Sequence, residues 1–228
     1  MSETRPVIAF DLDGTLVDTA PDLLSTLDLV LSTHNIPPVD RDEARPMIGG
    51  GARMLIMRAL THAGVAVETT ELDRMNRQFL DHYAAHIADE SRPFPGLIEA
   101  LDRLEAQGAI LAVCTNKLEY LARLLLDGLG LTQRFAAITG ADTYGIAKPD
   151  PKPLLSTIAA CGGDPRRAIM VGDSATDVNT ARACRIPAVA VTFGYTEIPA
   201  AQLGADRVIA HFSELGLAVD DLLRSTAA

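Results

Sequence analysis

The chain has 228 residues, of which 48% are hydrophobic and 22% charged, a composition typical of a folded globular protein. It carries 20 Lys and Arg against 30 Asp and Glu, a net charge of −10, which has the wrong sign for binding a nucleic-acid backbone. Since no apolar run approaches the roughly 20 residues of a transmembrane helix and the first residues lack a signal-peptide layout, we expect a cytoplasmic protein without a membrane or nucleic-acid partner.

The first predicted element is a strand at Pro6 to Phe10, because the run is short, apolar and rich in Val and Ile. The alternation of strand and helix is then interrupted from about residue 21 to residue 91, where the periodicity predicts helices and no convincing strand. These three helices are expected near Pro21–Thr33, Ala52–Ala63 and Glu71–Ile87. We therefore expect an all-helical cap over residues 21–91, inserted into a core made of residues 1–20 and 92–228.

Beyond the insert, apolar runs and amphipathic stretches alternate along the chain. The predicted strands are Ala109 to Cys114, Ala136 to Thr139, Ala168 to Val171, Ala188 to Thr192 and Arg207 to Ile209. The predicted helices are Gly96–Gln107, Glu119–Gly128, Pro151–Ala160, Ala175–Cys184 and Ser213–Leu223. This alternation predicts an α/β fold with a doubly wound, Rossmann-like parallel sheet.

The cysteines stand far apart and form no CxxC pair. We expect them to be small buried hydrophobic residues of a protein in a reducing compartment. They are Cys114, Cys161 and Cys184.

Polar side chains follow four of the predicted strands or the loops after them. They are Asp11, Asp13, Thr115, Lys148 and Asp173. In an open α/β sheet, ligands bind outside the carboxyl ends of the strands, so we expect these groups to meet at one edge. Because side chains alternate along an extended segment, the carboxylates of Asp11 and Asp13 are predicted to point to the same spot.

Clustered carboxylates repel one another unless a cation neutralises them, and oxygen ligands with room for water suit Mg²⁺. One carboxylate beside such an ion has the position to attack phosphorus, while a second serves as general acid and base. A hydroxyl, backbone N–H groups and a lysine would hold the phosphoryl oxygens. The pattern therefore predicts phosphoryl transfer from a small phosphorylated metabolite, with Mg²⁺ as cofactor.

Four ordered stretches of the chain resemble the motifs of the haloacid dehalogenase superfamily: Phe10 to Thr19 (FDLDGTLVDT), Thr115, Lys148 and Gly172 to Asp177 (GDSATD). The resemblance covers nearly the whole chain. It implies that Asp11 is the nucleophile and a metal ligand. It also implies that Asp13 is the general acid and base and a metal ligand through its backbone carbonyl.

The same resemblance implies roles for the remaining polar groups. Thr115 and Lys148 would bind the phosphoryl group, and Asn116 would assist by its backbone amide. Asp173 would be a metal ligand, and Asp177 would support the site. The acid at position 13 favours phosphoryl transfer over carbon–halogen hydrolysis, because superfamily dehalogenases do not need an acid there.

Within the superfamily, three stretches make the chain look most like bacterial phosphoglycolate phosphatases: Ile48 to Leu55 (IGGGARML), Cys114 to Lys117 (CTNK) and Ala147 to Pro153 (AKPDPKP). This resemblance implies 2-phosphoglycolate as the substrate, with Gly50 and Arg53 as substrate-binding residues. Glycine lets backbone amides approach a small anion, and an arginine pairs well with a carboxylate. Hydrolysis of another small phosphomonoester, a phosphomutase and a binding protein without activity are the alternatives. The chain is expected to be a monomer or a homodimer.

Simpler structural roles remain open for several of these residues. Thr115 alone would serve as a helix N-cap, and Arg53 as a solvated cap residue. His82 and His86 stand four residues apart on one predicted helix face, a spacing that can hold zinc. A partly solvated helix face is the preferred interpretation of the two histidines, because the glutamate of a zinc-protease motif is missing.

Overall fold

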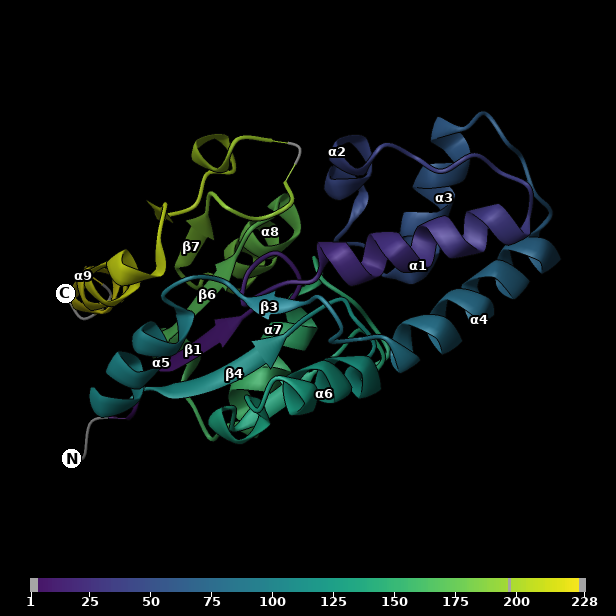
Figure 1. Cartoon of the computed structure of the whole chain (residues 1–228). Helices are drawn as coiled ribbons and strands as arrows, with labels where there is room; N and C mark the ends of the chain where they lie inside the picture. The colour runs from purple at the N-terminus through teal and green to yellow at the C-terminus, as the bar shows by residue number, and fades with distance from the viewer. Residues whose placement is uncertain (1–3, 197, 226–228) are drawn as a thin grey trace.

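The computed structural model describes residues 4–196 and 198–225, and its centre is a six-stranded, all-parallel sheet in the order β5-β4-β1-β6-β7-β8 (Figure 1). The strands are β1 (Val7–Phe10), β4 (Ile110–Cys114), β5 (Ala137–Thr139), β6 (Ala168–Gly172), β7 (Ala188–Val191) and β8 (Arg207–Ile209). The first strand lies inside the sheet, between β4 and β6, so the strand order reverses there. The predicted doubly wound sheet is confirmed.

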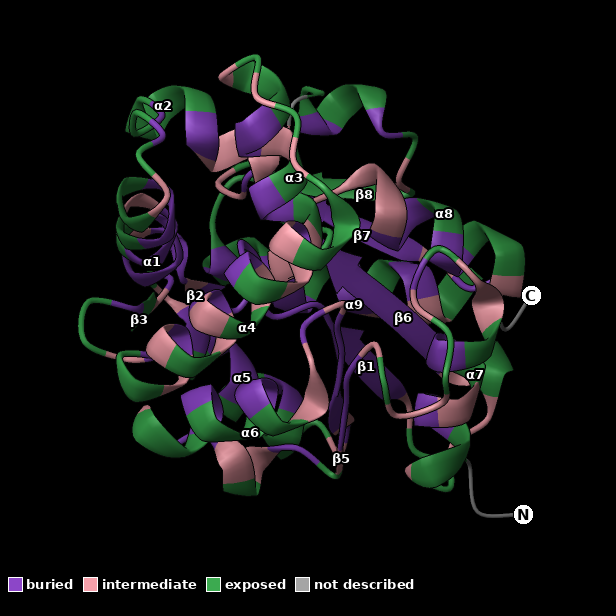
Figure 2. Ribbon diagram, turned by 90° about the vertical axis from the view of Figure 1, so that its right-hand side faces the viewer, coloured by how far each residue is buried: buried purple, intermediate pink, exposed green. Residues whose placement is uncertain are grey.

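Helices cover both faces of this sheet. Buried residues of one face pack with α5 (Leu97–Ala106), α6 (Glu119–Gly128) and α9 (Leu215–Ser225). Those of the other face pack with α7 (Pro151–Ala160) and α8 (Ala175–Cys184). Along β1, Ile8 and Phe10 face the first group and Val7 and Ala9 the second. Burial on both faces explains why the strands read as continuous apolar runs (Figure 2).

Short 3₁₀ turns complete the α/β part of the chain. They are η2 (Thr132–Arg134), η3 (Pro165–Arg167), η4 (Ala200–Gln202) and η5 (Phe212–Glu214). The last turn, η5, occupies the first two residues of the helix predicted at Ser213–Leu223. Consequently α9 starts two residues later than expected.

Between β2 (Val17–Asp18) and β3 (Arg92–Pro93) the chain forms a helical insert. Its main helices lie close to the predicted positions. They are α1 (Ala20–Thr33), α3 (Ala52–His62) and α4 (Thr69–Ala85). The sequence did not reveal α2 (Arg41–Ala44), η1 (Arg45–Met47) or the antiparallel β2–β3 pair, because elements of two to four residues are too short for a periodic pattern.

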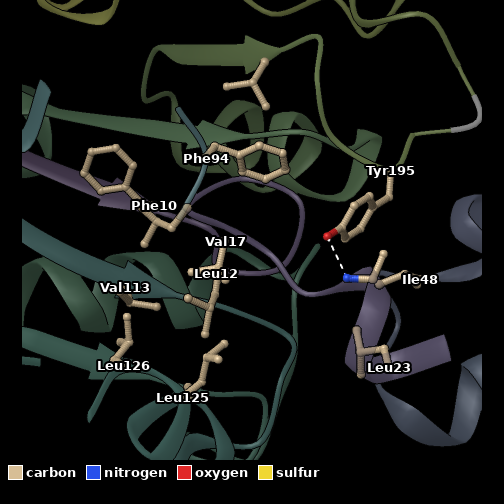
Figure 3. Close-up of a cluster of buried hydrophobic side chains, with 14 of the residues drawn as sticks. Phe10, Leu12, Val17, Leu23, Ile48, Phe94, Val113, Leu125, Leu126 and Tyr195 are labelled. Atoms are coloured by element: carbon tan, nitrogen blue, oxygen red, sulfur yellow. Dashed lines mark hydrogen bonds between the residues drawn. The ribbon is translucent and has the colours of Figure 1, made fainter. Parts of the chain in front are cut away.

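The insert and the sheet share one hydrophobic cluster. Leu12 and Val17, which follow β1, pack in the same cluster as Leu23 of α1 and Ile48 of the loop before α3 (Figure 3). The β2–β3 pair joins the two places where the chain crosses between the sheet and the insert. The insert is therefore held directly over the carboxyl edge of the sheet.

The three free cysteines differ in burial. Cys114 is buried at the end of β4, as predicted, but Cys161 and Cys184 are half-buried. The prediction of full burial is wrong for these two because they lie at the ends of α7 and α8, where the helices approach the surface. Along residues 4–196 and 198–225, no helix is long and apolar enough to cross a bilayer.

Candidate active site

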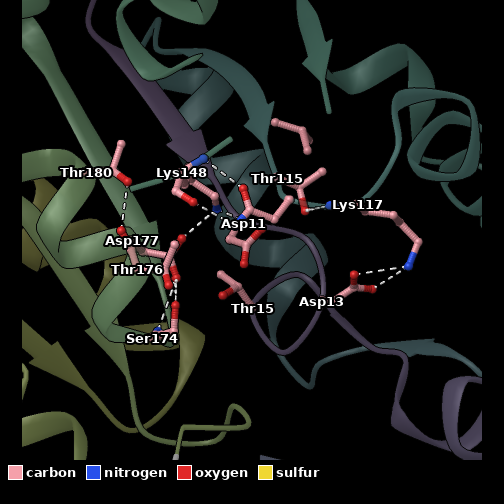
Figure 4. Close-up of polar contacts among 12 residues, drawn as sticks. Asp11, Asp13, Thr15, Thr115, Lys117, Lys148, Ser174, Thr176, Asp177 and Thr180 are labelled. Atoms are coloured by element: carbon pink, nitrogen blue, oxygen red, sulfur yellow. Dashed lines mark hydrogen bonds and ion pairs between the residues drawn. The ribbon is translucent and has the colours of Figure 1, made fainter. Parts of the chain in front are cut away.

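The predicted site residues come from loops that leave neighbouring strands at the same edge of the sheet (Figure 4). The Asp11 amide, directly after β1, donates to the Val171 carbonyl of β6 at 2.9 Å. The Thr115 amide, directly after β4, donates to the Thr139 carbonyl at 3.0 Å. Backbone pairing therefore continues past the strand ends and places the side chains that follow.

A cluster of carboxylates lies at this edge. Among the described residues, Asp11, Asp173 and Asp177 each offer an oxygen, and these oxygens lie within 4.8 Å of one another. Burial raises the pKa of Asp11 to about 6, although Lys148 opposes the shift. Burial, with Asp177 and Asp11 adding to it, raises the pKa of Asp173 to about 8. Buried carboxyl groups next to one another resist ionisation. A divalent cation bound between them would favour their charged forms, so the cluster fits such an ion.

Lys148 supplies a buried positive charge to the cluster. Its Nζ lies 2.5 Å from Asp177 Oδ1 and 3.0 Å from Asp11 Oδ1 (Figure 4). Burial alone would lower the pKa of Lys148, but the carboxylates of Asp11 and Asp177 raise it above its ordinary value. Lys148 is thus a charged part of the site and not a solvated surface lysine.

The position of Lys148 depends on Asn116. The Asn116 side chain donates to the Lys148 carbonyl at 3.1 Å and accepts from the Lys148 amide at 2.9 Å. The resemblance implied a role for the backbone of Asn116 only. The side-chain role was missed because it joins two loops that are 32 residues apart in the sequence.

Asp177 is held by the start of α8. Its Oδ2 accepts from the Ser174 amide at 3.1 Å and from Ser174 Oγ at 2.7 Å. The carboxylate thereby satisfies the amide of the N-cap residue of α8 in a capping box, while its other oxygen pairs with Lys148. Asp177 thus has the supporting position that the resemblance implied, and it also belongs to the carboxylate cluster.

Asp13 does not point to the same spot as Asp11, contrary to the prediction from strand periodicity. Its carboxylate oxygens lie 2.8 and 3.0 Å from Lys117 Nζ, and Oδ1 also accepts from Thr19 Oγ1 at 2.7 Å. Figure 4 shows the side chain turned toward Lys117. The alternation rule fails because β1 ends at Phe10 and the chain then bends into a turn.

Lys117 is a site residue that the sequence analysis missed. Burial would lower its pKa, but Asp13 and the adjacent Tyr83 raise it, so the ammonium remains charged. Its position in the loop after β4, three residues beyond a predicted strand, was the available signal. Tyr83 of α4 was missed as well, because the sequence does not indicate which face of the insert meets the sheet.

A pocket of about 240 Å³ lies between the insert and the sheet. The expected residues that line it are Asp11, Asp13, Gly50, Arg53, Thr115 and Asn116. Lys148 and Asp173 are not among the residues that line it: Lys148 contacts Asp11, and Asp173 belongs to the carboxylate cluster. The pocket therefore opens onto Asp11 from the insert side.

The glycine loop of the insert reaches the sheet edge. A Cβ atom on Gly51 would lie 3.5 Å from the Asn116 carbonyl oxygen, and Gly51 has a φ of +83°. Arg53 forms an ion pair with Asp73 of α4, and its side chain is 42% exposed. Gly50 and Arg53 are thus at the pocket, while substrate binding by either residue stays a prediction.

Thr115 and the pair His82 and His86 each had a simpler structural role open to them. Thr115 is not the N-cap of α6, because the helix begins at Glu119 and its N-cap is Leu118. His82 and His86 stack at 4.4 Å between ring centroids, and their Nδ1 atoms contact Thr26 Oγ1 and the Asp89 carboxylate. Neither belongs to the metal-compatible cluster found among the described residues, which favours the helix-face interpretation.

Comparison with known proteins identifies the family. The family model of haloacid dehalogenase-like hydrolases matches residues 8–191, which include Asp11, Thr115, Lys148 and Asp173. A capped α/β hydrolase is therefore the class that fold and site define. The chain belongs to the haloacid dehalogenase-like hydrolase family, as the resemblance of its motifs implied.

Its relatives differ in the substrates that their names record. The chain is 49% identical to the phosphoglycolate phosphatase of Mesorhizobium japonicum, over 93% of each chain. It is 36% identical to the N-acetylmuramic acid 6-phosphate phosphatase of Pseudomonas aeruginosa, over 91% of this chain and 92% of the relative. A crystal structure described as a predicted phosphoglycolate phosphatase from Haemophilus somnus superposes with a TM-score of 0.88, at 31% identity, covering 96% of this chain and 99% of that one.

Proposed function

We propose that this protein is a Mg²⁺-dependent phosphatase that hydrolyses 2-phosphoglycolate to glycolate and phosphate. The observation that carries the proposal is the position of Asp11: it lines the pocket and contacts both Lys148 and the carboxylate cluster. A nucleophile, a fixed cation and oxygen ligands for a metal are thus within one small volume. The identity to proteins named phosphoglycolate phosphatase supports the choice of substrate.

In this proposal, Asp11 forms the covalent intermediate and Asp13 transfers the protons. An Asp11 oxygen attacks phosphorus while the bond from phosphorus to the glycolate oxygen breaks, giving an aspartyl-phosphate. Asp13 gives its proton to the departing oxygen and then takes one from the water that attacks the intermediate. Phosphate leaves and the Asp11 carboxylate is restored.

The surrounding groups bind the phosphoryl oxygens. Thr115 Oγ1, the Asn116 amide and the Lys148 ammonium are the donors that this chain provides around Asp11. Asp11 and Asp173, with the Asp13 carbonyl, would hold Mg²⁺, which supplies positive charge to neutralise the phosphoryl group. The buried Lys148 adds a second positive charge that does not depend on the metal.

A panel of phosphorylated metabolites, assayed for release of inorganic phosphate, tests this function. We expect 2-phosphoglycolate to be hydrolysed with the highest kcat/KM, EDTA to stop the reaction and Mg²⁺ to restore it. Faster hydrolysis of another ester, such as N-acetylmuramic acid 6-phosphate, would show that 2-phosphoglycolate is not the preferred substrate. An isomerised sugar phosphate in place of free phosphate would favour a phosphomutase. Activity that EDTA does not affect would contradict the proposed dependence on Mg²⁺.

A further inference from the structure

Lys117 and Tyr83 meet inside the pocket from opposite sides. Lys117 lies in the loop after β4, and Tyr83 lies on α4 of the insert. The Lys117 Nζ stands 4.6 Å from the centroid of the Tyr83 ring, and both residues line the pocket. An ammonium over an aromatic face is attracted by the ring's electron density. The pair therefore forms a contact between the sheet and the insert beside Asp13.

The Tyr83 hydroxyl lacks an acceptor for its proton. It is buried, the residue being only 1% exposed, and none of the described residues accepts a hydrogen bond from it. The Lys117 ammonium interacts with its oxygen, but an ammonium group only donates. Burial raises the pKa of Tyr83 to about 12, so the hydroxyl keeps its proton and remains a donor. A buried donor without an acceptor is costly. At the wall of a pocket, such a donor indicates a ligand that supplies the acceptor.

The Lys117 ammonium brings a positive charge to the same place. Of its three N–H groups, two reach the oxygens of Asp13, and the ammonium also interacts with the Tyr83 hydroxyl. Among the described residues that line the pocket, Arg53 is the other basic one, but its side chain is 42% exposed. Lys117, whose side chain is 4% exposed, is therefore the buried cation of this pocket.

We propose that Lys117 and Tyr83 form a subsite for the carboxylate of the substrate's leaving group. This inference rests on the proposed function, in which Asp13 protonates the leaving oxygen. Lys117 touches Asp13, so an anionic group one carbon away from that oxygen lies beside the ammonium and the Tyr83 hydroxyl. The carboxylate of 2-phosphoglycolate has this spacing. The subsite selects esters whose alcohol is an α-hydroxy acid over those of neutral alcohols.

Two substrates test the subsite without any change to the protein. 2-Hydroxyethyl phosphate has the size of 2-phosphoglycolate, but a neutral hydroxyl group replaces the carboxylate. We expect its KM to be about 10- to 100-fold higher in the wild type, the value of a charge-assisted hydrogen bond. Equal KM values for the two esters would overturn the subsite.

Two variants assign this preference to the two residues. Lys117→Met keeps most of the side chain's length, and Tyr83→Phe keeps the ring. We expect Lys117→Met to raise the KM for 2-phosphoglycolate about 10- to 100-fold, and Tyr83→Phe to raise it several-fold. The KM for 2-hydroxyethyl phosphate should change little in either variant. Lys152→Met, at an exposed lysine of α7, is the matched control.

The outcomes separate the subsite from other roles. A loss of kcat that is the same for both esters, without a selective rise in the KM for 2-phosphoglycolate, would mean that Lys117 only positions Asp13, and would overturn the proposal. If wild type does not hydrolyse 2-phosphoglycolate, the proposed substrate is wrong, and both compounds are compared as inhibitors of p-nitrophenyl phosphate hydrolysis. Equal inhibition would then overturn the subsite. If Lys117→Met fails to fold, the KM values of the two esters in the wild type and in Tyr83→Phe still test the subsite.

Discussion

Asp11 lies between groups that act on it in opposite directions. The Lys148 ammonium is 3.0 Å from its Oδ1 and favours the carboxylate, while burial and the neighbouring carboxylates disfavour it. A divalent cation would shift this balance toward the charged form, which is the form that attacks phosphorus. The same residue therefore links metal binding to reactivity.

Asp11→Asn tests the nucleophile. We expect kcat for phosphate release to fall by about 10⁴-fold or more, because an amide neither attacks phosphorus nor carries the charge that the metal requires. Circular dichroism should show an unchanged fold, since Asn has nearly the same shape. Asp89→Asn, at an exposed site on the insert, should keep full activity. Turnover near the wild-type rate would contradict the assignment.

At the scale of secondary structure, Tyr195 joins the loop after β7 to the start of α1 (Figure 3). Its hydroxyl accepts from the amides of Thr19 at 2.6 Å and Ala20 at 3.0 Å, and donates to Asp18 at 2.6 Å. The first amides of a helix have no partner inside the helix. Tyr195 therefore supplies that partner where the chain enters the insert.

Tyr195→Phe tests this junction. The substitution leaves two buried amides without their partner and removes one of the hydrogen bonds to Asp18, which keeps Arg45. We therefore expect the free energy of unfolding to fall by about 1–3 kcal/mol. Urea denaturation followed by circular dichroism measures the loss. Tyr120→Phe, at a half-exposed tyrosine on α6, is the control and should change stability little. A midpoint equal to that of the wild type would show that the junction does not depend on this hydroxyl.

The helices and strands were largely predictable, because each is long enough to show its period or is buried on both faces. The strand at β1 and the helix α6 are examples, the latter with the same bounds as predicted. The start of α1 is different: Thr19 is its N-cap, but the Thr19 hydroxyl bonds to Asp13 and caps no helical amide. Such choices depend on neighbours that are distant in sequence.

For the whole molecule, the buried carboxylates couple metal binding, pH and stability. The pKa values of Asp11 and Asp173 are raised in the folded protein to about 6 and about 8, above their ordinary value of 3.8. From about pH 4 to about pH 8, these two carboxyl groups bind more protons in the folded chain than in the unfolded chain. The contribution of these two groups to stability is therefore complete at acidic pH and is lost as pH rises toward 8.

Thermal unfolding in EDTA and in Mg²⁺ tests this coupling. Without metal, we expect the Tm of the wild type, relative to Asp173→Asn, to fall as pH rises from 5 to 8. Mg²⁺ at 100 times its Kd would stabilise the protein by about 2.7 kcal/mol, or about 5–10 °C in Tm. At one fixed Mg²⁺ concentration, this gain should be larger at pH 8 than at pH 5, since protons compete for the same oxygens and weaken metal binding at the lower pH. A gain that is independent of pH, or equal in Asp173→Asn, would contradict the site.

The sequence by itself determined the parallel sheet, the helical insert and the convergence of Asp11, Thr115, Lys148 and Asp173. Apolar periodicity reflects burial, and parallel strands bring their carboxyl ends to one edge wherever they fall in the chain. Only the tertiary structure decided the partner of Asp13 and the contact between Lys117 and Tyr83. Both depend on how the insert packs over the sheet and on side-chain directions in a turn, and neither follows from a local period.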